Sequence, residues 1–417
     1  MNEGCIPTKA LLRSAEVMNL VQRRAEQFGV RGIDPGALSF DLAAAMQRKD
    51  AIVGGVIDGI YGNLKKNSGI TFLTGRASFA SPKEIRVDEQ LLAVDKTILA
   101  VGAQVTQPQI PGLEESGYIT NDEALHLERL PASMIIIGAG YVGVEFAQMY
   151  ARFGTRVTLV GRAPRVMPGE EPELSELLGD ILRSEGIEVR TATEVLAAGR
   201  NGKQPYVTTR KAEAEQRLEA EVLLLAAGRT ARTAGLGLDQ AGVHLAGNFL
   251  QIDDQLRTTA PNIWSLGDAN GGAMFTHRAK FDGPLTALNA VRGLERTVDY
   301  RVVPRAIFTE PALASVGLTE QQARDAGYEV RVGRESFAGY ARAKALAETE
   351  GLVKLVVDAA TDEILGGHIL GPHADLLIHE VAVAMHDRGS IERLGKTIHV
   401  HPTLSEVVMG AAKAASR

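Results

Sequence analysis

The sequence predicts an α/β fold with two or three domains, and three of its features carry that prediction. From Ser133 the pattern runs strand, glycine turn, helix and strand, which makes a complete βαβ unit. Continuous apolar runs, such as 134–137 and 222–227, are typical of buried parallel strands. The last block, about 303–417, places helices after alternating strands, which predicts an α+β unit of the kind that builds interfaces.

The first third of the chain predicts two helices and a group of short strands. Amphipathic patterns indicate helices over about 8–25 and 40–66, with a loop rich in glycine and proline between them. Turn residues then divide short strand-like segments, which cover 70–73, 77–79, 84–87 and 97–102. Two prolines within 107–112 stop regular structure, and we expect the chain to cross between domains there.

The remaining elements follow in the same way. After the βαβ unit we expect a helix over 174–185, a strand over 187–190 and the buried run near Leu223. A strand ending in Gly-Asp is expected over 262–268, and a helix over 277–293. In the last block, about 303–417, we expect strands over 306–309, 353–357 and 364–370. Two helices are expected after them.

Composition excludes several classes of function. Hydrophobic residues make up 45% of the 417 residues and charged residues 23%, which is ordinary for a globular protein. The 45 basic and 51 acidic residues are interspersed, so no basic surface recommends nucleic acid as a partner. The apolar runs are too short to span a bilayer, and we expect no membrane association. With no signal-peptide pattern and a single cysteine, we expect a cytoplasmic protein.

A glycine-rich turn predicts a dinucleotide site. Gly138, Gly140 and Gly143 form a Gly-x-Gly-x-x-Gly that follows an apolar strand and opens a helix. Glycines permit the tight turn and the close approach of the backbone to a pyrophosphate, whose charge then sits at the helix N-terminus. The same hexapeptide without this strand and helix would be weak evidence.

The end of the second strand of this unit favours NADPH over NADH. Sites for NADH usually carry an acid there, which binds the ribose 2′-hydroxyl. This sequence has Gly161, followed by Arg162 and Arg165. Two guanidinium groups can form charge-assisted bonds to a 2′-phosphate. The alternative is that both arginines are simply solvated.

The only cysteine in the sequence, Cys5, lies directly before a helical pattern. A helix N-terminus lowers the pKa of a thiol, and Gly4 and Pro7 suit a close backbone approach and a first helical turn. We therefore expect a reactive thiol. The alternative is a small buried hydrophobic side chain, which free cysteines usually are.

Residues 2–9, Asn-Glu-Gly-Cys-Ile-Pro-Thr-Lys, resemble the end of the redox motif of flavin-dependent pyridine nucleotide-disulfide oxidoreductases, Gly-Gly-Thr-Cys-x-Asn-x-Gly-Cys-x-Pro-(Ser/Thr)-Lys. Members of this family include dihydrolipoamide dehydrogenases, glutathione reductases and mercuric reductases. The resemblance covers essentially the whole chain, and its other segments are 97–103, 222–229, 259–268, 314–319, 366–372 and 399–406. Residues 228–232 depart from the usual Gly-Arg-x-Pro-Asn of the family.

The resemblance implies FAD and NAD(P)H as cofactors and two Rossmann-like nucleotide-binding domains with a C-terminal α+β dimerisation domain. The FAD-binding domain would contain 1–112 and 243–302 without its first βαβ unit, the NAD(P)-binding domain 113–242, and the dimerisation domain 303–417. The resemblance also implies a homodimer.

Individual residues also inherit expected roles from the family. Cys5 corresponds to the flavin-proximal cysteine, and Lys9 and Glu145 to a pair near the flavin N5. Tyr141 corresponds to a tyrosine that gates the nicotinamide pocket. The alternative for Glu145 is a helix first-turn acid stabilised by the dipole, and for Tyr141 it is packing at the turn.

Four further residues are implied to lie around the flavin. Asp268, after Gly267, corresponds to the aspartate that binds the ribityl chain, and the alternative is a turn-forming acid. Gly102 and Gly228 correspond to glycines at paired strand-to-glycine crossings near the domain boundaries.

The segment 399–406 resembles the family's His-Pro-Thr-x-x-Glu signature. It implies that His401, oriented by Glu406, acts as acid–base on the redox cysteines of the partner subunit. Imidazole suits this role because its pKa lies near operating pH. The alternative is a structural histidine beside a helix start.

The partner of Cys5 and the first βαβ unit of the FAD domain are not in the sequence. We expect the natural polypeptide to begin roughly 30 to 45 residues upstream, enough for one βαβ unit. Met1 would then occupy the variable position after the first cysteine of the motif.

Three functions remain open on the sequence alone. The first is an FAD-dependent NAD(P)H oxidoreductase acting on a disulfide or a metal, in which hydride from NADPH reaches a cysteine pair that includes Cys5. The second is an inactive, dimeric NADP(H)-binding fragment or paralogue. The third is a flavin diaphorase that passes electrons to quinones or oxygen. Residues 370–374 look nearest to the mercuric-reductase-like branch, although the C-terminus lacks a vicinal cysteine pair.

Overall fold

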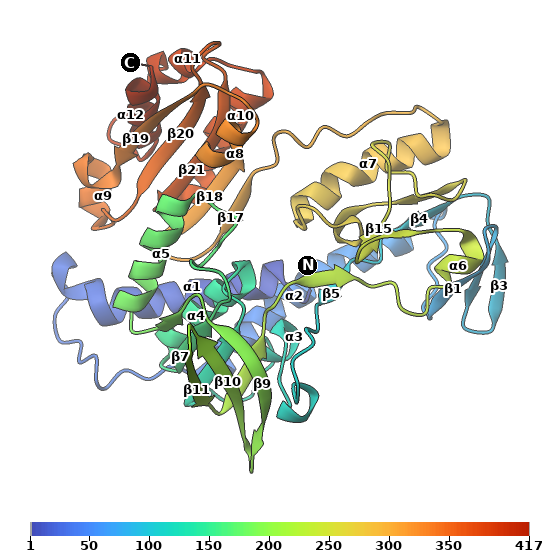
Figure 1. The fold of residues 1–417 in the computed structure, drawn as a ribbon, viewed down its shortest axis with the longest axis horizontal. Coiled ribbons are helices and arrows are strands. Elements are labelled where there is room, and N and C mark those ends of the chain that lie inside the picture. The colour runs from blue at the N-terminus through green and yellow to red at the C-terminus, as the bar shows by residue number, and fades with distance from the viewer. Residues whose placement is uncertain (1, 417) are drawn as a thin grey trace. The chain divides into compact units, whose positions relative to one another are not determined.

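The structure is a computed structural model that describes residues 2–416 (Figure 1). Met1, which the sequence places inside the redox motif, and Arg417 lie outside the described residues. The chain forms two compact units, each assembled from segments distant in sequence. The larger unit contains 6–50, 108–227 and the chain from 301 onward, and the smaller contains the residues up to 5, 51–107 and 228–300.

A four-stranded parallel sheet lies in the larger unit, in the order β12 (Val222–Leu225), β6 (Ser133–Ile137), β7 (Arg156–Val160) and β8 (Glu188–Arg190). Every residue of β6 is buried, as its apolar run predicts. The helix α4 (Tyr141–Phe153) connects β6 to β7, and α5 (Pro172–Ser184) connects β7 to β8. The expected βαβ unit from Ser133 is therefore confirmed.

The first two helices pack into the core beside α4. The helix α1 (Cys5–Asn19) continues as a π-helical turn, Leu20–Arg24, and a 3₁₀ turn, Ala25–Phe28, and α2 covers Leu42–Lys66. Buried Leu11 of α1 and Met46 of α2 share one hydrophobic cluster with Phe146 of α4. Phe40, just before α2, stacks on Phe153 with ring centroids 3.8 Å apart. The two helices that the sequence predicts are therefore observed.

Between β8 and β12 in the sequence, the chain forms a separate antiparallel sheet that the sequence analysis did not predict. It has the order β11 (Ala214–Glu219), β10 (Gln204–Lys211) and β9 (Glu194–Asn201). A short helix, α3 (Asn121–Ala124), precedes β6 and begins with a capping box made by Thr120 and Glu123.

The chain from 301 onward forms a five-stranded antiparallel sheet in the order β17 (Arg305–Ile307), β18 (Ala312–Gly317), β21 (Ile364–Gly371), β20 (Leu352–Asp358) and β19 (Val330–Ser336). The helices around it are α8 (Glu320–Asp325), α9 (Ala341–Leu346), α10 (Ala374–His386), α11 (Ile391–Lys396) and α12 (Ser405–Ala415). Gly333 permits a close approach of α12 to β19, because a Cβ there would lie 2.0 Å from the Ala411 oxygen. The α+β prediction is confirmed, and the described residues form three helices after β21 where the sequence predicts two.

The smaller unit contains several short sheets. Its parallel pair is β4 (Thr97–Leu99) with β16 (Ile263–Ser265), and its three-stranded sheet is β1 (Ala77–Ser81), β2 (Glu84–Val87) and β3 (Gln90–Ala93). The antiparallel pairs are β5 (Ala103–Val105) with β13 (Arg229–Ala231) and β14 (Leu245–Ala246) with β15 (Phe249–Leu250). Its helices include the second part of α2, from 51 onward, with α6 (Leu238–Ala241) and α7 (Thr276–Arg292).

The strand expected over 70–73 is wrong, because this segment has no regular structure. Its apolar pattern suits a strand, but no described strand pairs with it, and Ile70, Phe72 and Leu73 are exposed. The Phe72 ring instead meets the Tyr61 ring of α2 edge to face, with centroids 5.5 Å apart. Among the described residues, no helix combines the length and apolar character that a membrane span needs.

Candidate active site

The glycine loop between β6 and α4 has the geometry of a phosphate-binding turn. Gly138 has φ of +115°, and a Cβ on it would lie 2.2 Å from the Ala226 oxygen. A Cβ on Gly143 would lie 1.7 Å from the Gly138 oxygen, so only glycine fits there. Gly140 is the residue before α4, and the space around its Cβ position is open. The loop is therefore closed against the protein at Gly138 and Gly143 and open at Gly140.

The two arginines after β7 are available for a ligand. Arg162 is exposed, and within residues 2–416 it makes no hydrogen bond or ion pair. Arg165 lies 3.9 Å from Glu176, and its Nε is buried without an acceptor among the described residues. Gly161 packs against Ala139 of the glycine loop, since a Cβ on it would lie 2.7 Å from the Ala139 Cβ. The arginines therefore follow a strand end that touches the loop.

Tyr141, the first residue of α4, is bonded to a buried ion pair. Its hydroxyl donates to Glu170 Oε1 at 2.5 Å, and Arg305 Nε donates to the same oxygen at 2.7 Å. Burial and the nearby Glu170 carboxylate raise the pKa of the Tyr141 hydroxyl above its ordinary value. Burial opposes ionisation of Glu170, but Arg305 outweighs it and holds the pKa of that carboxyl below its usual value. Glu170 is therefore an anion that accepts from two donors.

Lys9 and Glu145 are brought together as the resemblance implied. The Lys9 ammonium lies 2.9 Å from both carboxylate oxygens of Glu145, whose side chain is only 7% exposed. The backbone N–H of Phe308 donates to Glu145 Oε1 at 2.9 Å. Lys9 also lies over the Phe308 ring, 4.5 Å from its centroid. Residues 308–310, which join β17 to β18, therefore complete this ion pair, and we call them the 308–310 strap.

The 308–310 strap lies along one face of α4. Gln148 exchanges two hydrogen bonds with the backbone of Glu310, both at 2.8 Å, one turn after Glu145. One turn further on, Arg152 donates to the Glu310 oxygen at 3.1 Å and pairs with its carboxylate. Glu145, Gln148 and Arg152 share a helix face because their spacing is three and four residues. Three polar residues of α4 thus hold the strap.

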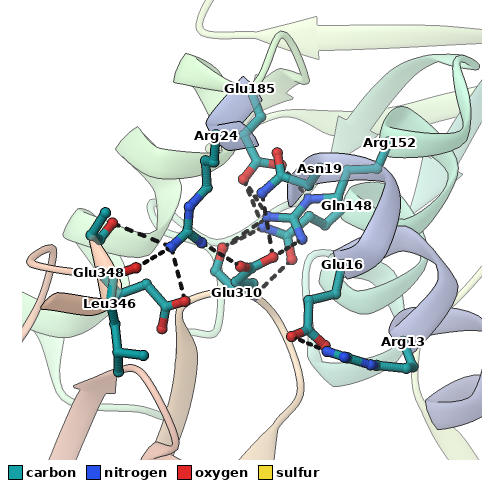
Figure 2. A network of polar contacts seen from close by, with 11 residues as sticks. Arg13, Glu16, Asn19, Arg24, Gln148, Arg152, Glu185, Glu310, Leu346 and Glu348 are labelled. Atoms are coloured by element: carbon teal, nitrogen blue, oxygen red, sulfur yellow. Dashed lines mark hydrogen bonds and ion pairs between the residues drawn. The ribbon is translucent and has the colours of Figure 1, made fainter. Parts of the chain in front are cut away.

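The strap also receives contacts from the end of the first helix, as Figure 2 shows. Arg24 donates to Glu310 Oε1 at 2.9 Å, to the Leu346 oxygen at 2.7 Å and to Glu348 at 3.0 Å. Arg152 also forms a two-bond pair with Glu185 at 2.7 and 3.0 Å.

Arg152 remains charged inside this network. Burial opposes its charge, but Glu185 and Glu310 outweigh burial and keep the pKa of Arg152 above its usual value. The network therefore fixes α1, α4 and the 308–310 strap against one another within the larger unit.

Cys5 begins α1 and is exposed, so it is not the small buried hydrophobic side chain of the alternative interpretation. Its sulfur lies 3.1 Å from the hydroxyl oxygen of Thr276, the first residue of α7. The thiol therefore lies beside the first residue of a second helix.

The four residues expected around the flavin all belong to the smaller unit. Gly102 follows β4, and Gly267 and Asp268 follow β16, so all three come after the carboxyl ends of two parallel strands. Gly102, Gly228 and Gly267 have φ of +69°, +110° and +71°. Within residues 2–416 the Asp268 carboxylate has no hydrogen-bond or ion-pair partner. An unpaired acid at a strand end is available to a polar ligand.

His401 and Glu406 form a bonded pair, as the resemblance implied. His401 Nδ1 lies 2.9 Å from Glu406 Oε1, and Glu406 Oε2 accepts the Thr403 N–H at 2.9 Å. The hydrogen bonds from His401 and then from Thr403 lower the pKa of the Glu406 carboxyl. The His401 side chain is 73% exposed, and within the described part of the larger unit it makes no hydrogen bond or ion pair with Lys9 or Glu145. Nε2 therefore faces outward while Nδ1 is held.

A second buried ion cluster ties the segment before α5 to the C-terminal sheet. Lys354 of β20 is buried and lies 2.5 Å from Glu171 and 2.9 Å from Glu320. Arg324 donates to Glu320 at 2.8 Å. The bonds from Arg324 and Lys354 lower the pKa of the Glu320 carboxyl from 4.5 to about 2.

We expect this cluster to contribute acid-labile stability. Because the pKa of Glu320 is lower in the folded protein, its contribution is present above pH 4.5 and is lost as the pH falls towards about 2. Between these values the Glu320→Gln variant should lose less free energy of unfolding than the wild type, measured by urea denaturation. The exposed Glu213 provides the control, and Glu213→Gln should keep the wild-type pH dependence. Equal acid losses in Glu320→Gln and wild type would contradict the role of Glu320.

Comparison with known proteins decides the family. Residues 1–283 match the family described as pyridine nucleotide-disulphide oxidoreductase, and residues 303–412 match the dimerisation domain of that family. The chain belongs to the class I pyridine nucleotide-disulfide oxidoreductases. The expected fold class, two Rossmann-like nucleotide-binding domains with an α+β dimerisation domain, is thereby confirmed.

Relatives of this chain include proteins with different enzyme names. It is 40% identical to a dihydrolipoyl dehydrogenase of Chlorobaculum tepidum, over 99% of this chain and 88% of that protein. It is 36% identical to a mercuric reductase of Streptomyces lividans, again over 99% and 88%. The HOCl-induced flavoprotein disulfide reductase RclA from Escherichia coli matches it with a TM-score of 0.87 and 30% identity, over 99% of this chain and 90% of that one.

The oxidoreductases of this family use FAD and NAD(P)H, and the structure fits the two groups to different extents. The loop closed at Gly138 and Gly143 and open at Gly140 fits a pyridine dinucleotide. The unpaired Asp268 after β16 fits the hydroxyl groups of a flavin side chain. A second Gly-x-Gly-x-x-Gly, which would hold the flavin pyrophosphate, does not occur in the sequence. The residues present therefore account for part of a flavin site.

Several residues of this oxidoreductase were missed by sequence analysis. Thr276, Glu170, Arg305 and the 308–310 strap all contact candidate site residues. Their partners lie far away in the sequence, and no local pattern marks them. Among the described residues, no group of three or more His, Cys, Asp or Glu side chains is arranged to hold a metal ion.

Proposed function

We propose that this chain is an FAD-dependent oxidoreductase of disulfide or metal substrates, in which hydride from NADPH reaches the flavin and then a redox-active cysteine pair, of which Cys5 is the member present in this sequence. The observation that carries the proposal is the position of the Lys9–Glu145 pair. Tyr141, in the dinucleotide loop, and Glu145 lie one turn apart on the same face of α4. Lys9, bonded to Glu145, lies one turn along α1 from Cys5. The helices α1 and α4 thus connect the coenzyme loop, the Lys9–Glu145 ion pair and the Cys5 thiol.

Each residue has a defined part in this proposal. FAD, when bound, would accept the hydride and pass two electrons to a disulfide between Cys5 and its partner cysteine, which becomes two thiols. Lys9 supplies a positive charge that Glu145 and the Phe308 ring hold in place. Cys5, whose sulfur contacts the Thr276 hydroxyl, is the flavin-proximal member of the cysteine pair. Tyr141 gates the nicotinamide side of the loop.

The proton is handled by His401. Reduction of one disulfide by NADPH consumes one proton and yields two thiols, so a group must hold and release protons near the sulfurs. His401 has Nδ1 bonded to Glu406 and Nε2 facing outward, which suits an acid–base acting outside its own chain. We propose a homodimer in which His401 acts across the interface, in keeping with the dimerisation domain over 303–412.

The proposed domains are those expected from the sequence: an FAD-binding domain of 1–112 and 243–302, an NAD(P)-binding domain of 113–242 and a dimerisation domain of 303–417. The flavin would be bordered by four residues, which are Gly102, Gly228, Gly267 and Asp268. The cytoplasm is the proposed location, because one cysteine in 417 residues suits a reducing compartment.

A second candidate is a flavin diaphorase that passes electrons to quinones or oxygen. It is favoured by one observation, that Cys5 is the single cysteine of the sequence. Dithiol exchange takes two thiols, whereas hydride transfer to a flavin takes none. The coenzyme loop and the Lys9–Glu145 pair serve both candidates equally.

Anaerobic titration of the purified full chain with NADPH tests the proposal and the coenzyme preference together. We expect a flavin absorption spectrum that NADPH bleaches at lower concentration than NADH. Arg162→Gln should raise the NADPH concentration needed by about tenfold, since one charge-assisted bond to the 2′-phosphate is lost, and should leave NADH unchanged. Arg156 is exposed at the other end of β7, so Arg156→Gln is the matched control.

The other outcomes of this titration are equally informative. A bound flavin that neither coenzyme bleaches would rule out the oxidoreductase. A colourless protein that still binds NADPH would support the inactive NADP(H)-binding alternative. Bleaching without reduction of added disulfide, but with reduction of a quinone, would favour the diaphorase.

A further inference from the structure

The turn that carries Asp268 is held by the helix α7. Gly267–Asn270 form a 3₁₀ turn one residue after β16, and we call these residues the Asp268 turn. The Asp282 side chain, which is 0% exposed, accepts the Gly267 N–H on Oδ2 at 3.2 Å. A Cβ on Gly267, whose φ is +71°, would lie 3.0 Å from the Ala279 Cβ, so α7 lies directly against the turn. The residue before Asp268 is therefore fixed by α7.

Asp282 lies in a buried group of polar side chains. Its Oδ1 accepts the Tyr300 hydroxyl at 2.7 Å, and its Oδ2 lies 3.6 Å from Arg278 Nε in a buried ion pair. The Arg278 guanidinium also lies over the Tyr300 ring, 4.5 Å from its centroid. Burial and then the bond to Asp282 raise the pKa of the Tyr300 hydroxyl to about 12, so this hydroxyl stays a donor. Both carboxylate oxygens of Asp282 are thus engaged.

The other end of the Asp268 turn is held by Arg278. Arg278 Nη1 donates to the backbone oxygen of Gly271, directly after the turn, and to that of Ala273 at 3.4 Å. The Asp268 carboxylate, in contrast, has no hydrogen-bond or ion-pair partner among residues 2–416. The turn is therefore held at both ends by α7, while the carboxylate that it carries remains available.

The Arg278–Asp282 pair is better explained by the geometry of the turn than by stability. A buried ion pair adds little stability, because the cost of removing two charges from water offsets much of their attraction. Apolar side chains of similar volume would fill the same space without that cost. What the Asp282 carboxylate adds is a directed acceptor for one backbone N–H. A binding group that is held in place before its ligand arrives binds more tightly, since less motion is lost on binding.

We infer that Asp282 and Arg278 are positioning residues for the flavin, which hold the Asp268 turn so that the Asp268 carboxylate is already in place for the hydroxyl groups of the ribityl chain. This inference rests on the proposed function, in which Asp268 borders the flavin. Asp282 is fully buried, so it acts on the flavin through the turn rather than by contact. Loss of its bond to the turn should therefore weaken flavin binding only while the Asp268 carboxylate is there to be positioned.

Flavin binding to four forms of the full chain tests this dependence. The flavin-free protein is titrated with FAD, and quenching of flavin fluorescence gives the dissociation constants of the wild type, Asp282→Asn, Asp268→Asn and the double variant. Asparagine has one acceptor oxygen where aspartate has two, so it cannot accept from both the Gly267 N–H and the Tyr300 hydroxyl. We expect Asp282→Asn to weaken FAD binding about tenfold in the wild type and no more than about twofold in the Asp268→Asn background.

A second variant tests the other end of the turn. Arg278→Met removes the donor to the Gly271 oxygen, and it should show the same dependence on Asp268 as Asp282→Asn does. Asp239 is exposed on α6 of the same unit, so Asp239→Asn is the matched control and should keep the wild-type FAD affinity.

Hydrogen exchange of the flavin-free chain tests the contact itself. Peptides that cover 264–271 should exchange faster in Asp282→Asn and Arg278→Met than in the wild type, because the turn has lost a bond to α7. Peptides from the sheet over 77–93 should exchange as in the wild type, which would show that the smaller unit stays folded. Faster exchange in both regions would show that the two residues support the whole unit and would contradict a positioning role.

Two further results would overturn the inference while flavin binding, and with it the proposed function, stands. Equal losses of FAD affinity for Asp282→Asn with and without the Asp268 carboxylate would show that Asp282 does not act through Asp268. Unchanged FAD affinity in both Asp282→Asn and Arg278→Met would show that the turn needs no support from α7. A wild type that takes up no FAD would instead remove the proposed function, and the positioning role with it.

Discussion

Replacing Arg152 by methionine is expected to lower the free energy of unfolding by about 3–5 kcal/mol, because it leaves the buried Glu185 carboxylate without its cation. The Arg152 side chain is 6% exposed and pairs with Glu185, which is 9% exposed, and with Glu310 of the 308–310 strap. Methionine keeps much of the volume, so the loss reports the charge rather than a cavity. Urea denaturation at neutral pH measures it.

Arg13 provides the control for this prediction within the same view (Figure 2). It pairs with Glu16 on the surface, where their side chains are 59% and 45% exposed. Arg13→Met should therefore cost no more than about 1 kcal/mol. If Arg152→Met lost as little free energy of unfolding as Arg13→Met, the network around the strap would contribute no more than an exposed ion pair. It would then not fix α1 to α4.

Replacing Gly143 by alanine is expected to abolish coenzyme binding. The new Cβ would lie 1.7 Å from the Gly138 oxygen, so the turn and the start of α4 must separate. We expect NADPH affinity to fall by at least about 100-fold, equivalent to about 2.7 kcal/mol, as well as a loss of stability of about 1–3 kcal/mol from overpacking. Calorimetry with NADPH and urea denaturation measure the two effects.

Two other glycines separate these effects. The Cβ position of Gly140 is open, so Gly140→Ala should keep the stability of the wild type. It should lose coenzyme affinity, since we expect the pyrophosphate to approach the backbone at this open position. Gly339 is exposed with open space around it, and Gly339→Ala should change neither. Tight NADPH binding by Gly143→Ala would show that the coenzyme does not use this loop.

The sequence predicts well those parts of the fold whose pattern lies within one short segment of the chain. The glycines at 138, 140 and 143 stand next to the strand and helix that they join, so one short segment contains the whole βαβ pattern. The failures also have local causes. Residues 70–73 look like a strand, but pairing depends on a neighbour that the pattern does not show. The strands β10 and β11 are mostly polar and carry little apolar signal.

The candidate site was predictable only where a family motif marks it. Lys9 and Glu145 were expected as a pair from the resemblance, although 136 residues separate them. The Phe308 amide, which completes the pair, is a backbone group and leaves no trace in the sequence. Glu170 and Arg305 are ordinary charged residues 135 positions apart, and only the folded chain shows that they hold one tyrosine.

The network at the end of α1 can form only late in the synthesis of the chain. Arg24 leaves the ribosome early, yet its partner Glu348 follows 324 residues later. At about 5–20 residues per second this interval is about 16–65 s, during which the first helix has none of the C-terminal contacts shown in Figure 2. The redox motif can therefore reach its final position only after nearly the whole polypeptide has been made, and a nascent chain arrested before the strap would carry Lys9 without the Phe308 contacts that complete its pair.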